Sequence, residues 1–98
     1  MTTNTLDRRA AVKHLLSNRG DALTVSSLGG PSYDVAAIQV DFEQDFPLGG
    51  AMGQATSTGL GLALSRPNNR VIVFVGDGEM LMSLGSLATI GAEKPENL

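Results

Sequence analysis

The tripeptide Gly76-Asp77-Gly78 follows five consecutive apolar residues, Val71–Val75, and precedes a stretch with helical periodicity. In open α/β sheets, ligands bind beyond the carboxyl ends of the strands. The helix that follows such a strand presents free N–H groups and a partial positive charge, which favour phosphate. Asp77 supplies a hard oxygen ligand, and Mg²⁺ is usually held by carboxylates together with phosphate oxygens. The pattern therefore predicts a Mg²⁺-diphosphate site, and the alternative is a tight turn in which Asp77 only caps the helix.

The elements that position this site alternate between helices and strands. Two apolar segments are predicted as strands, at 22–28 and 70–75, and the second is expected to be buried on both faces because it has no polar alternation. Strands alternating with helices indicate a parallel sheet with helices on its faces. The helices are predicted at 7–20, 32–38, 49–66 and 79–91, with Asp7 and Ser32 as N-terminal caps, Gly20 as a C-terminal stop, and an irregular loop at 41–47.

The predicted helix 49–66 carries small residues on one stripe, where Met52, Ala55, Gly59 and Ala63 share a face. Gly59 and Gly61 each lower helix propensity by roughly 1 kcal/mol relative to Ala. Close packing of the helix against the sheet would be a physical reason to retain them.

Composition excludes several function classes. The formal net charge is −3 and the seven basic residues are scattered, which argues against a nucleic-acid surface or a polybasic membrane anchor. There is no cysteine and only one histidine, so thiolate chemistry and multi-histidine metal clusters are excluded within this sequence. No apolar run is long enough to span a bilayer, and a cytoplasmic protein is the expectation.

Three segments together resemble the pyrophosphate-binding domain of thiamine diphosphate (ThDP) enzymes. Residues 71–89, Val-Ile-Val-Phe-Val-Gly-Asp-Gly-Glu-Met-Leu-Met-Ser-Leu-Gly-Ser-Leu-Ala-Thr, are similar to the family signature that begins with Gly-Asp-Gly. Residues 48–53, Leu-Gly-Gly-Ala-Met-Gly, resemble the glycine-rich segment of the same domain, and residues 26–34 match a strand-end loop more loosely. The closest subgroup is the phosphonopyruvate and sulfopyruvate decarboxylases. The resemblance implies a Rossmann-like, three-layer α/β fold.

The resemblance also implies roles for individual residues. Asp77 would bind Mg²⁺, and Gly78 and Glu79, after Gly76, would meet the diphosphate mainly through backbone N–H groups. The residues expected near the pyrimidine end of the cofactor are Gly50, Ala51, Met52 and Gly30, with Gly29 and Tyr33 close by. Each has a plainer alternative: Met52 as a core residue, Tyr33 as a packing residue, and Glu79 as a first-turn carboxylate favoured by the helix dipole.

No catalytic residue is expected in this chain. In the family, the glutamate that activates the cofactor lies on a separate pyrimidine-binding domain, which in some members is a separate subunit. The resemblance therefore implies a homo- or hetero-oligomer with a pyrimidine-binding domain or α subunit, acting together as a 2-oxo acid decarboxylase, a carbon–carbon lyase. Alone, the chain is expected to be catalytically silent.

The sequence departs from the family pattern at the second metal ligand, an Asn well downstream of Gly-Asp-Gly. Only twenty residues follow Gly78 (98 minus 78), and Asn97 falls where the next strand is expected to begin. Two predicted strands are also too few for a complete sheet. These observations predict that residues 1–98 are the N-terminal portion of a pyrophosphate-binding domain, truncated or completed by another polypeptide.

Two other functions remain open at this point. Certain lipid and sugar kinases also carry a Gly-Asp-Gly loop at a strand end, but with a glycine before it and a threonine after it, where this sequence has Val75 and Glu79. The second alternative is a non-catalytic fragment, or an assembly module, that keeps the fold without turnover.

Overall fold

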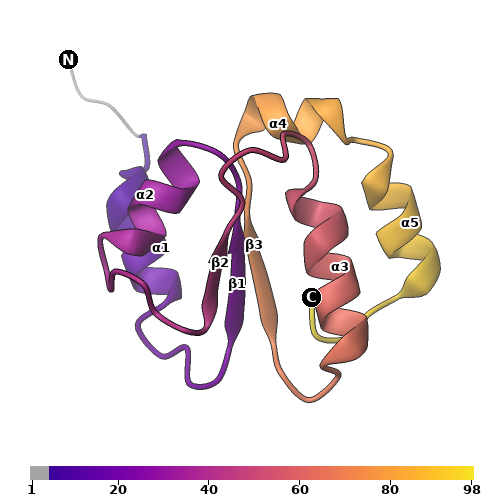
Figure 1. The fold of residues 1–98 in the computed structure, drawn as a ribbon, viewed down its shortest axis with the longest axis horizontal. Helices are drawn as coiled ribbons and strands as arrows, with labels where there is room; N and C mark the ends of the chain where they lie inside the picture. The colour runs from indigo at the N-terminus through magenta and orange to yellow at the C-terminus, as the bar shows by residue number, and fades with distance from the viewer. Residues whose placement is uncertain (1–4) are drawn as a thin grey trace.

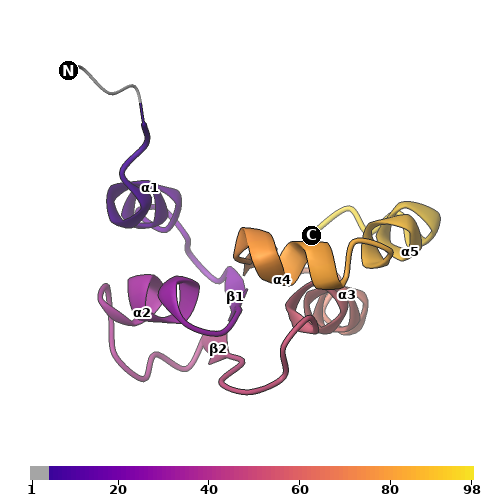
Figure 2. The ribbon, with the colours of Figure 1, turned by 90° about the horizontal axis from the view of Figure 1, so that it is seen from above.

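The computed structural model describes residues 5–98, which form three layers with a parallel sheet between two layers of helices (Figures 1 and 2). Helices α1 and α2 cover one face of the sheet, and α3 and α5 lie on the other. The predicted α/β class with a partial parallel sheet is confirmed. The elements are α1 (Arg8–Leu15), β1 (Leu23–Ser26), α2 (Gly30–Ala36), β2 (Asp45–Pro47), α3 (Ala55–Ser65), β3 (Val71–Phe74), α4 (Asp77–Met82) and α5 (Ser86–Glu93).

The sheet has the strand order β2-β1-β3, with both pairs parallel. Thr24 pairs with Asp45 on one side and with Ile72 on the other. The chain passes from β1 outward to β2 and then back across β1 to β3. The gap between β1 and β3 is therefore a topological switch point, where ligands bind in open α/β sheets.

Strand β2 corrects the prediction of an irregular loop at 41–47. The strand has only three residues and ends in Pro47. Because proline is tolerated in sheets only at edges or bulges, the sequence of this segment carries little strand signal. A second correction concerns β3. Only Val71 is buried in it, whereas Thr24, Val25 and Ser26 of β1 are all buried, because β1 is the central strand.

The layer of α1 and α2 packs a small apolar core against the sheet. Val12 and Leu16 meet Val35, and Ile72 and Phe74 of β3 pack on this cluster. Asp7 caps α1 as predicted, since its side chain accepts a hydrogen bond from the Arg9 N–H at 3.1 Å. The predicted stop at Gly20 is wrong: α1 ends at Leu15, and Gly20 turns the chain toward β1 with φ +55°.

Helix α2 begins earlier than predicted. Gly29, with φ +81°, precedes its first residue, and Pro31 occupies the first turn. Ser32 therefore lies inside the helix and is not its cap. Its hydroxyl instead donates to the Ser27 carbonyl oxygen at 2.7 Å, which ties the helix back to the strand it follows.

Helix α3 packs on β1 and β3 through small residues, as its stripe predicted. A Cβ atom on Gly59 would overlap Cγ2 of Val73, so this glycine allows the close approach of helix and sheet. Gly61 faces open space, and packing does not explain it. The helix begins at Ala55 and not at Gly49, because residues 49–54 form a loop that turns at Gly53 with φ +85°.

The predicted helix 79–91 is two helices, α4 and α5, with the break at Ser83–Gly85. Neither helix has a buried residue within the part of the chain described. A hydroxyl contact of 2.7 Å between Thr56 of α3 and Ser86 joins α5 to its neighbour.

Asn97 closes the described chain against α3 and β3. Its side-chain amide lies within hydrogen-bond distance of the carbonyl oxygens of Ala63, Arg66 and Asn69, at 2.9, 3.0 and 2.8 Å. Its own carbonyl oxygen accepts from the Val71 N–H at 2.7 Å. The predicted strand at 97–98 does not form. The hydrogen bond from Val71 nevertheless lies on the free edge of β3, where such a strand would pair.

A buried ion pair stabilises the opposite, amino-terminal end of the sheet. The Arg19 guanidinium lies 2.7 Å from the Asp45 carboxylate, and their side chains are only 12% and 10% exposed. Thr24 donates to the same carboxylate at 2.8 Å, and Arg19 also stacks on Phe42. This network holds β2 against β1. Over residues 5–98, none of the helices has the length and apolar character needed to cross a membrane.

Candidate functional site

The candidate site lies where the strands end, at the top of Figure 1. Three glycine-containing loops meet there: 27–29 after β1, 48–54 after β2, and 75–76 leading from β3 into α4. Leu48 N–H donates to the Ser26 carbonyl oxygen at 2.8 Å, and Gly76 N–H donates to the Ser27 hydroxyl at 3.1 Å. The packing of Met82 of α4 against Gly53 joins the second loop to the third.

Asp77 is the first residue of α4 and is exposed. Its Oδ1 accepts from the adjacent Gly78 N–H at 2.9 Å. A Cβ atom on Gly76 or Gly78 would meet no atom within 4 Å, and neither residue has a positive φ. Internal packing and backbone conformation therefore do not require these glycines. Bare backbone beside an exposed carboxylate fits a ligand that lies against the chain, which is what a metal-bound diphosphate needs.

Glu79 completes the first turn of α4. Its Oε2 atom is buried and has no hydrogen-bond partner within residues 5–98. The free N–H groups of a first helical turn are the usual partners of phosphate. In this conformation Asp77 occupies the Gly78 N–H, so a diphosphate would compete with that carboxylate for it. The donor set at the start of α4 therefore fits a diphosphate accompanied by a cation that draws Asp77 away.

Gly50, Ala51 and Met52 lie together in the loop before α3, and all are exposed. Met52 is 53% exposed, so the interpretation of it as a core residue is wrong for the described chain. Tyr33 is likewise 75% exposed and does not pack in the interior. The loop is anchored at both ends, by Leu48 on β1 and by Gly53 on α4, which holds these three residues on the carboxyl side of the sheet.

Gly30 has an internal explanation that the sequence did not suggest. A Cβ atom there would lie 3.0 Å from Nη1 of Arg8, whose guanidinium covers the glycine. Arg8 is held in place by an ion pair with Asp34, whose side chain is only 1% exposed. Because the Arg8 side chain is flexible and 62% exposed, packing explains Gly30 only in part, and Gly30 also borders the site.

A cavity of about 580 Å³ brings part of the predicted set together. Gly30, Gly76 and Asp77 all line it, and Arg8 and Asp34 line its α1–α2 wall. Gly50, Ala51 and Met52 do not line this cavity. The residues expected at the diphosphate and the loop residues 50–52 expected at the pyrimidine therefore lie at the same end of the sheet, but they do not line one common cavity.

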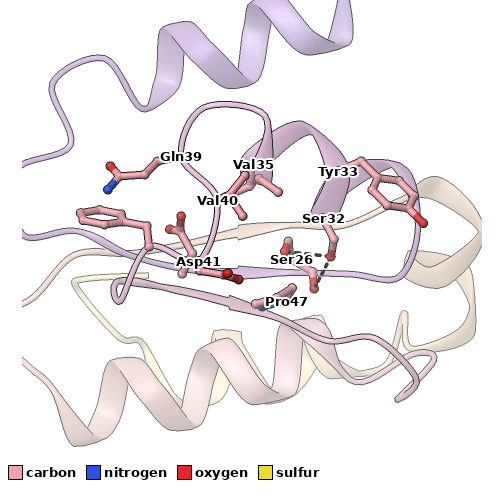
Figure 3. A pocket seen from close by; sticks show the side chains of 11 residues that line it. Ser26, Ser32, Tyr33, Val35, Gln39, Val40, Asp41 and Pro47 are labelled. Atoms are coloured by element: carbon pink, nitrogen blue, oxygen red, sulfur yellow. Dashed lines mark hydrogen bonds between the residues drawn. The ribbon is translucent and has the colours of Figure 1, made fainter.

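A second pocket, of about 450 Å³, lies between α2 and β2 (Figure 3). It is mostly apolar, with the hydroxyls of Ser26 and Ser32 hydrogen-bonded to each other at 3.0 Å. Of the residues expected near the cofactor, only Tyr33 lines it; Gly30, Gly50, Ala51, Met52 and the residues at 76–79 do not.

Sequence reasoning placed the segment 26–34 beside the cofactor but did not single out Ser27 or Asp34 within it, and it missed Arg8. The available signal was a pair of polar residues ending a buried strand, Ser26-Ser27, because buried polar groups require partners. For Arg8 and Asp34 the signal was weaker, since they are 26 positions apart and are joined only by the packing of α1 on α2.

Comparison with known proteins decides the family. The family model described as "Thiamine pyrophosphate enzyme, C-terminal TPP binding domain" matches residues 36–97. This range includes the loops at 48–54 and 75–76 and all of β3, α4 and α5. The chain belongs to this family. The Gly-Asp-Gly loop at the switch point is thus part of a thiamine pyrophosphate (TPP, the same cofactor as ThDP) domain, and the kinase-type alternative is set aside.

Curated relatives of the TPP domain share its sequence over most of this chain. Sulfopyruvate decarboxylase subunit beta from Methanothermobacter thermautotrophicus is 43% identical over 93 residues, which are 95% of this chain and 49% of that protein. The same subunit from Methanocaldococcus jannaschii is 45% identical over 88% of this chain and 45% of its own length. Phosphonopyruvate decarboxylase from Streptomyces viridochromogenes is 47% identical over 93% of this chain but 23% of its own length. The chain therefore spans about half, or less, of the relatives it matches.

Proposed function

We propose that residues 1–98 belong to one pyrophosphate-binding domain, which binds Mg²⁺-thiamine diphosphate as part of a 2-oxo acid decarboxylase. The names of the relatives, sulfopyruvate and phosphonopyruvate decarboxylases, support this reaction class. Both substrates carry an anionic sulfonate or phosphonate beside the 2-oxo acid group. The reaction cleaves a carbon–carbon bond and releases carbon dioxide, so the assembly would be a lyase.

The observation that carries this proposal is the start of α4, where an exposed carboxylate stands between two glycines that internal packing does not require. In the proposed site Asp77 binds the metal, and the backbone at Gly76, Gly78 and Glu79 contacts the diphosphate. The loop residues Gly50, Ala51 and Met52 line the pyrimidine side, and Gly30 borders the same end. Thiamine diphosphate, when bound, supplies the carbon nucleophile and electron sink of the reaction. The residues of this chain bind and orient it.

A partner must supply the acid–base group in this proposal. Three relatives are named as beta subunits, which supports an α-type subunit carrying the pyrimidine-binding domain. The exposed apolar side chains of α4 and the turn after it also support a covered surface: Leu81, Met82 and Leu84 are 73%, 62% and 54% exposed. The active unit is therefore proposed to be an oligomer.

The decisive experiment is a calorimetric titration of thiamine diphosphate with and without Mg²⁺, into the chain alone and into the chain purified with its α-type partner. We expect binding that requires Mg²⁺ and decarboxylation of a 2-oxo acid only by the pair. Sulfopyruvate, phosphonopyruvate and pyruvate would be compared as substrates.

Asp77→Ala tests the metal ligand, with Asp21→Ala as a matched control that removes an exposed carboxylate just before β1, at the other end of the sheet. We expect Asp77→Ala to abolish Mg²⁺-dependent binding and Asp21→Ala to leave it unchanged. Equal affinity in both variants would remove Asp77 from the site. Absence of binding in wild-type chain and pair alike would favour the non-catalytic module.

A further inference from the structure

Three serine hydroxyls cluster at the carboxyl end of β1. Ser26 and Ser27 are each 1% exposed, and Ser32 reaches them from α2. The Ser32 hydroxyl contacts the Ser26 hydroxyl at 3.0 Å (Figure 3). It also donates to the Ser27 carbonyl oxygen at 2.7 Å. Polar groups buried this deeply are costly unless they are hydrogen-bonded, so the positions of these side chains are fixed.

Ser27 connects this cluster to the loop after β3. Its N–H donates to the Phe74 carbonyl oxygen at 2.9 Å, and its hydroxyl accepts from the Gly76 N–H at 3.1 Å. The paired residues of β1 and β3 end at Ser26 and Phe74, so Gly76 lies beyond the strand ladder. The Ser27 hydroxyl therefore supplies an acceptor that the regular sheet no longer provides.

Asp77 directly follows Gly76, so the Ser27–Gly76 hydrogen bond lies one residue away from it. Within residues 5–98 the Asp77 carboxylate accepts a hydrogen bond from its neighbour Gly78, and no distant side chain in that range anchors it. The residue before Asp77 is Gly76, which caps α4 with φ −73° and ψ 158°. We propose that Ser27 is a positioning residue: through Gly76 it orients the Asp77 carboxylate and the start of α4 toward the metal-diphosphate. This inference rests on the proposed function.

The test compares Ser27→Ala with Ser32→Ala in the chain purified with its α-type partner. Ser32→Ala is the matched control, because it removes a hydroxyl from the same cluster without touching Gly76. We expect Ser27→Ala to raise the Mg²⁺ concentration for half-maximal thiamine diphosphate binding about tenfold, equivalent to about 1.4 kcal/mol. Ser32→Ala should lower the melting temperature and leave the Mg²⁺ requirement unchanged. Ser27→Thr, which keeps the hydroxyl, should restore the wild-type requirement.

Two further readouts separate positioning from general stability. Amide exchange at Gly76 should speed up in Ser27→Ala and not in Ser32→Ala, with or without cofactor. An equal Mg²⁺ requirement in wild type and Ser27→Ala, or an equal rise in both alanine variants, would overturn the inference and leave the proposed function standing. Lack of Mg²⁺-dependent binding by the wild-type pair would overturn both. If Ser27→Ala does not fold, wild-type behaviour of Ser27→Cys, with its weak sulfur acceptor, would also overturn the inference.

Discussion

The close contact between α3 and β3 makes a quantitative prediction, because two glycines on one helix differ only in what surrounds them. A Cβ atom on Gly59 would overlap Cγ2 of Val73, whereas a Cβ atom on Gly61 would meet no atom within 4 Å. Both positions lie inside α3. Replacing either by Ala gains helix propensity of roughly 1 kcal/mol. That gain cancels when the two variants are compared.

The difference between the variants therefore isolates the overlap. Inserting a methyl group into a well-packed interface costs roughly 1–3 kcal/mol. We expect Gly61→Ala to raise the free energy of unfolding by about 1 kcal/mol, as the propensity scale gives. Gly59→Ala should fall about 1–3 kcal/mol below Gly61→Ala. Urea unfolding measures this difference as a shift of the unfolding midpoint between the variants, provided that the slope (m-value) stays the same.

Val73→Ala supplies the internal check, because it removes the methyl groups that the new Cβ would meet. In the Gly59→Ala/Val73→Ala double variant the overlap is absent, so a favourable coupling of about 1 kcal/mol or more is expected from the double-mutant cycle. Equal stabilisation by Gly59→Ala and Gly61→Ala, together with zero coupling to Val73, would refute the account of α3 packing.

Two further predictions concern polar contacts away from the site. Asn97→Ala removes the amide that serves the carbonyl oxygens at the end of α3 and should lower the free energy of unfolding by about 1–3 kcal/mol. Asn68→Ala, at an exposed neighbouring position, should have little effect in the same urea assay. Asp45→Ala removes the charged partner of the largely buried Arg19, which keeps its contacts with the Ala22 and Gln44 carbonyl oxygens, and should destabilise by about 1–3 kcal/mol. Arg9→Ala removes a side chain that is 79% exposed and lies 3.8 Å from Asp34, which keeps its ion pair with Arg8, so it should cost less than about 1 kcal/mol. A similar loss in both variants would contradict this difference in burial.

The parts of the fold that sequence predicted are those fixed by local chemistry. Asp7 caps α1 because a side-chain oxygen after extended backbone satisfies a free N–H, and this depends on adjacent residues alone. Gly59 lies on the helix stripe because helical periodicity puts it there. The Gly-Asp-Gly segment follows β3 because glycine and aspartate are unfavourable in strands and so end the apolar run.

The missed features depend on residues distant in sequence. Strand β2 forms because β1 offers a free edge, and nothing in Asp45-Phe46-Pro47 itself favours a strand. The break between α4 and α5 interrupts an apolar pattern that continues through it, so periodicity predicted one helix. The contact between Arg8 and Gly30 forms only when α1 packs on α2, so the local sequence Gly29-Gly30 could not predict it.

The glycines also separate internal packing from ligand contact, which sequence alone cannot do. At Gly59 the space of a side chain is taken by Val73, so this glycine serves the fold. At Gly50 and Gly78 the space is open and the backbone is unstrained, so the fold gives no reason to exclude a side chain. Both open positions lie at the carboxyl end of the sheet, Gly50 in the loop after β2 and Gly78 in the first turn of α4, and hydrogen bonds to Ser26 and Ser27 tie the chain just before each of them to the end of β1. A glycine that the fold does not need, placed where the topology directs ligands, argues for a ligand that needs it.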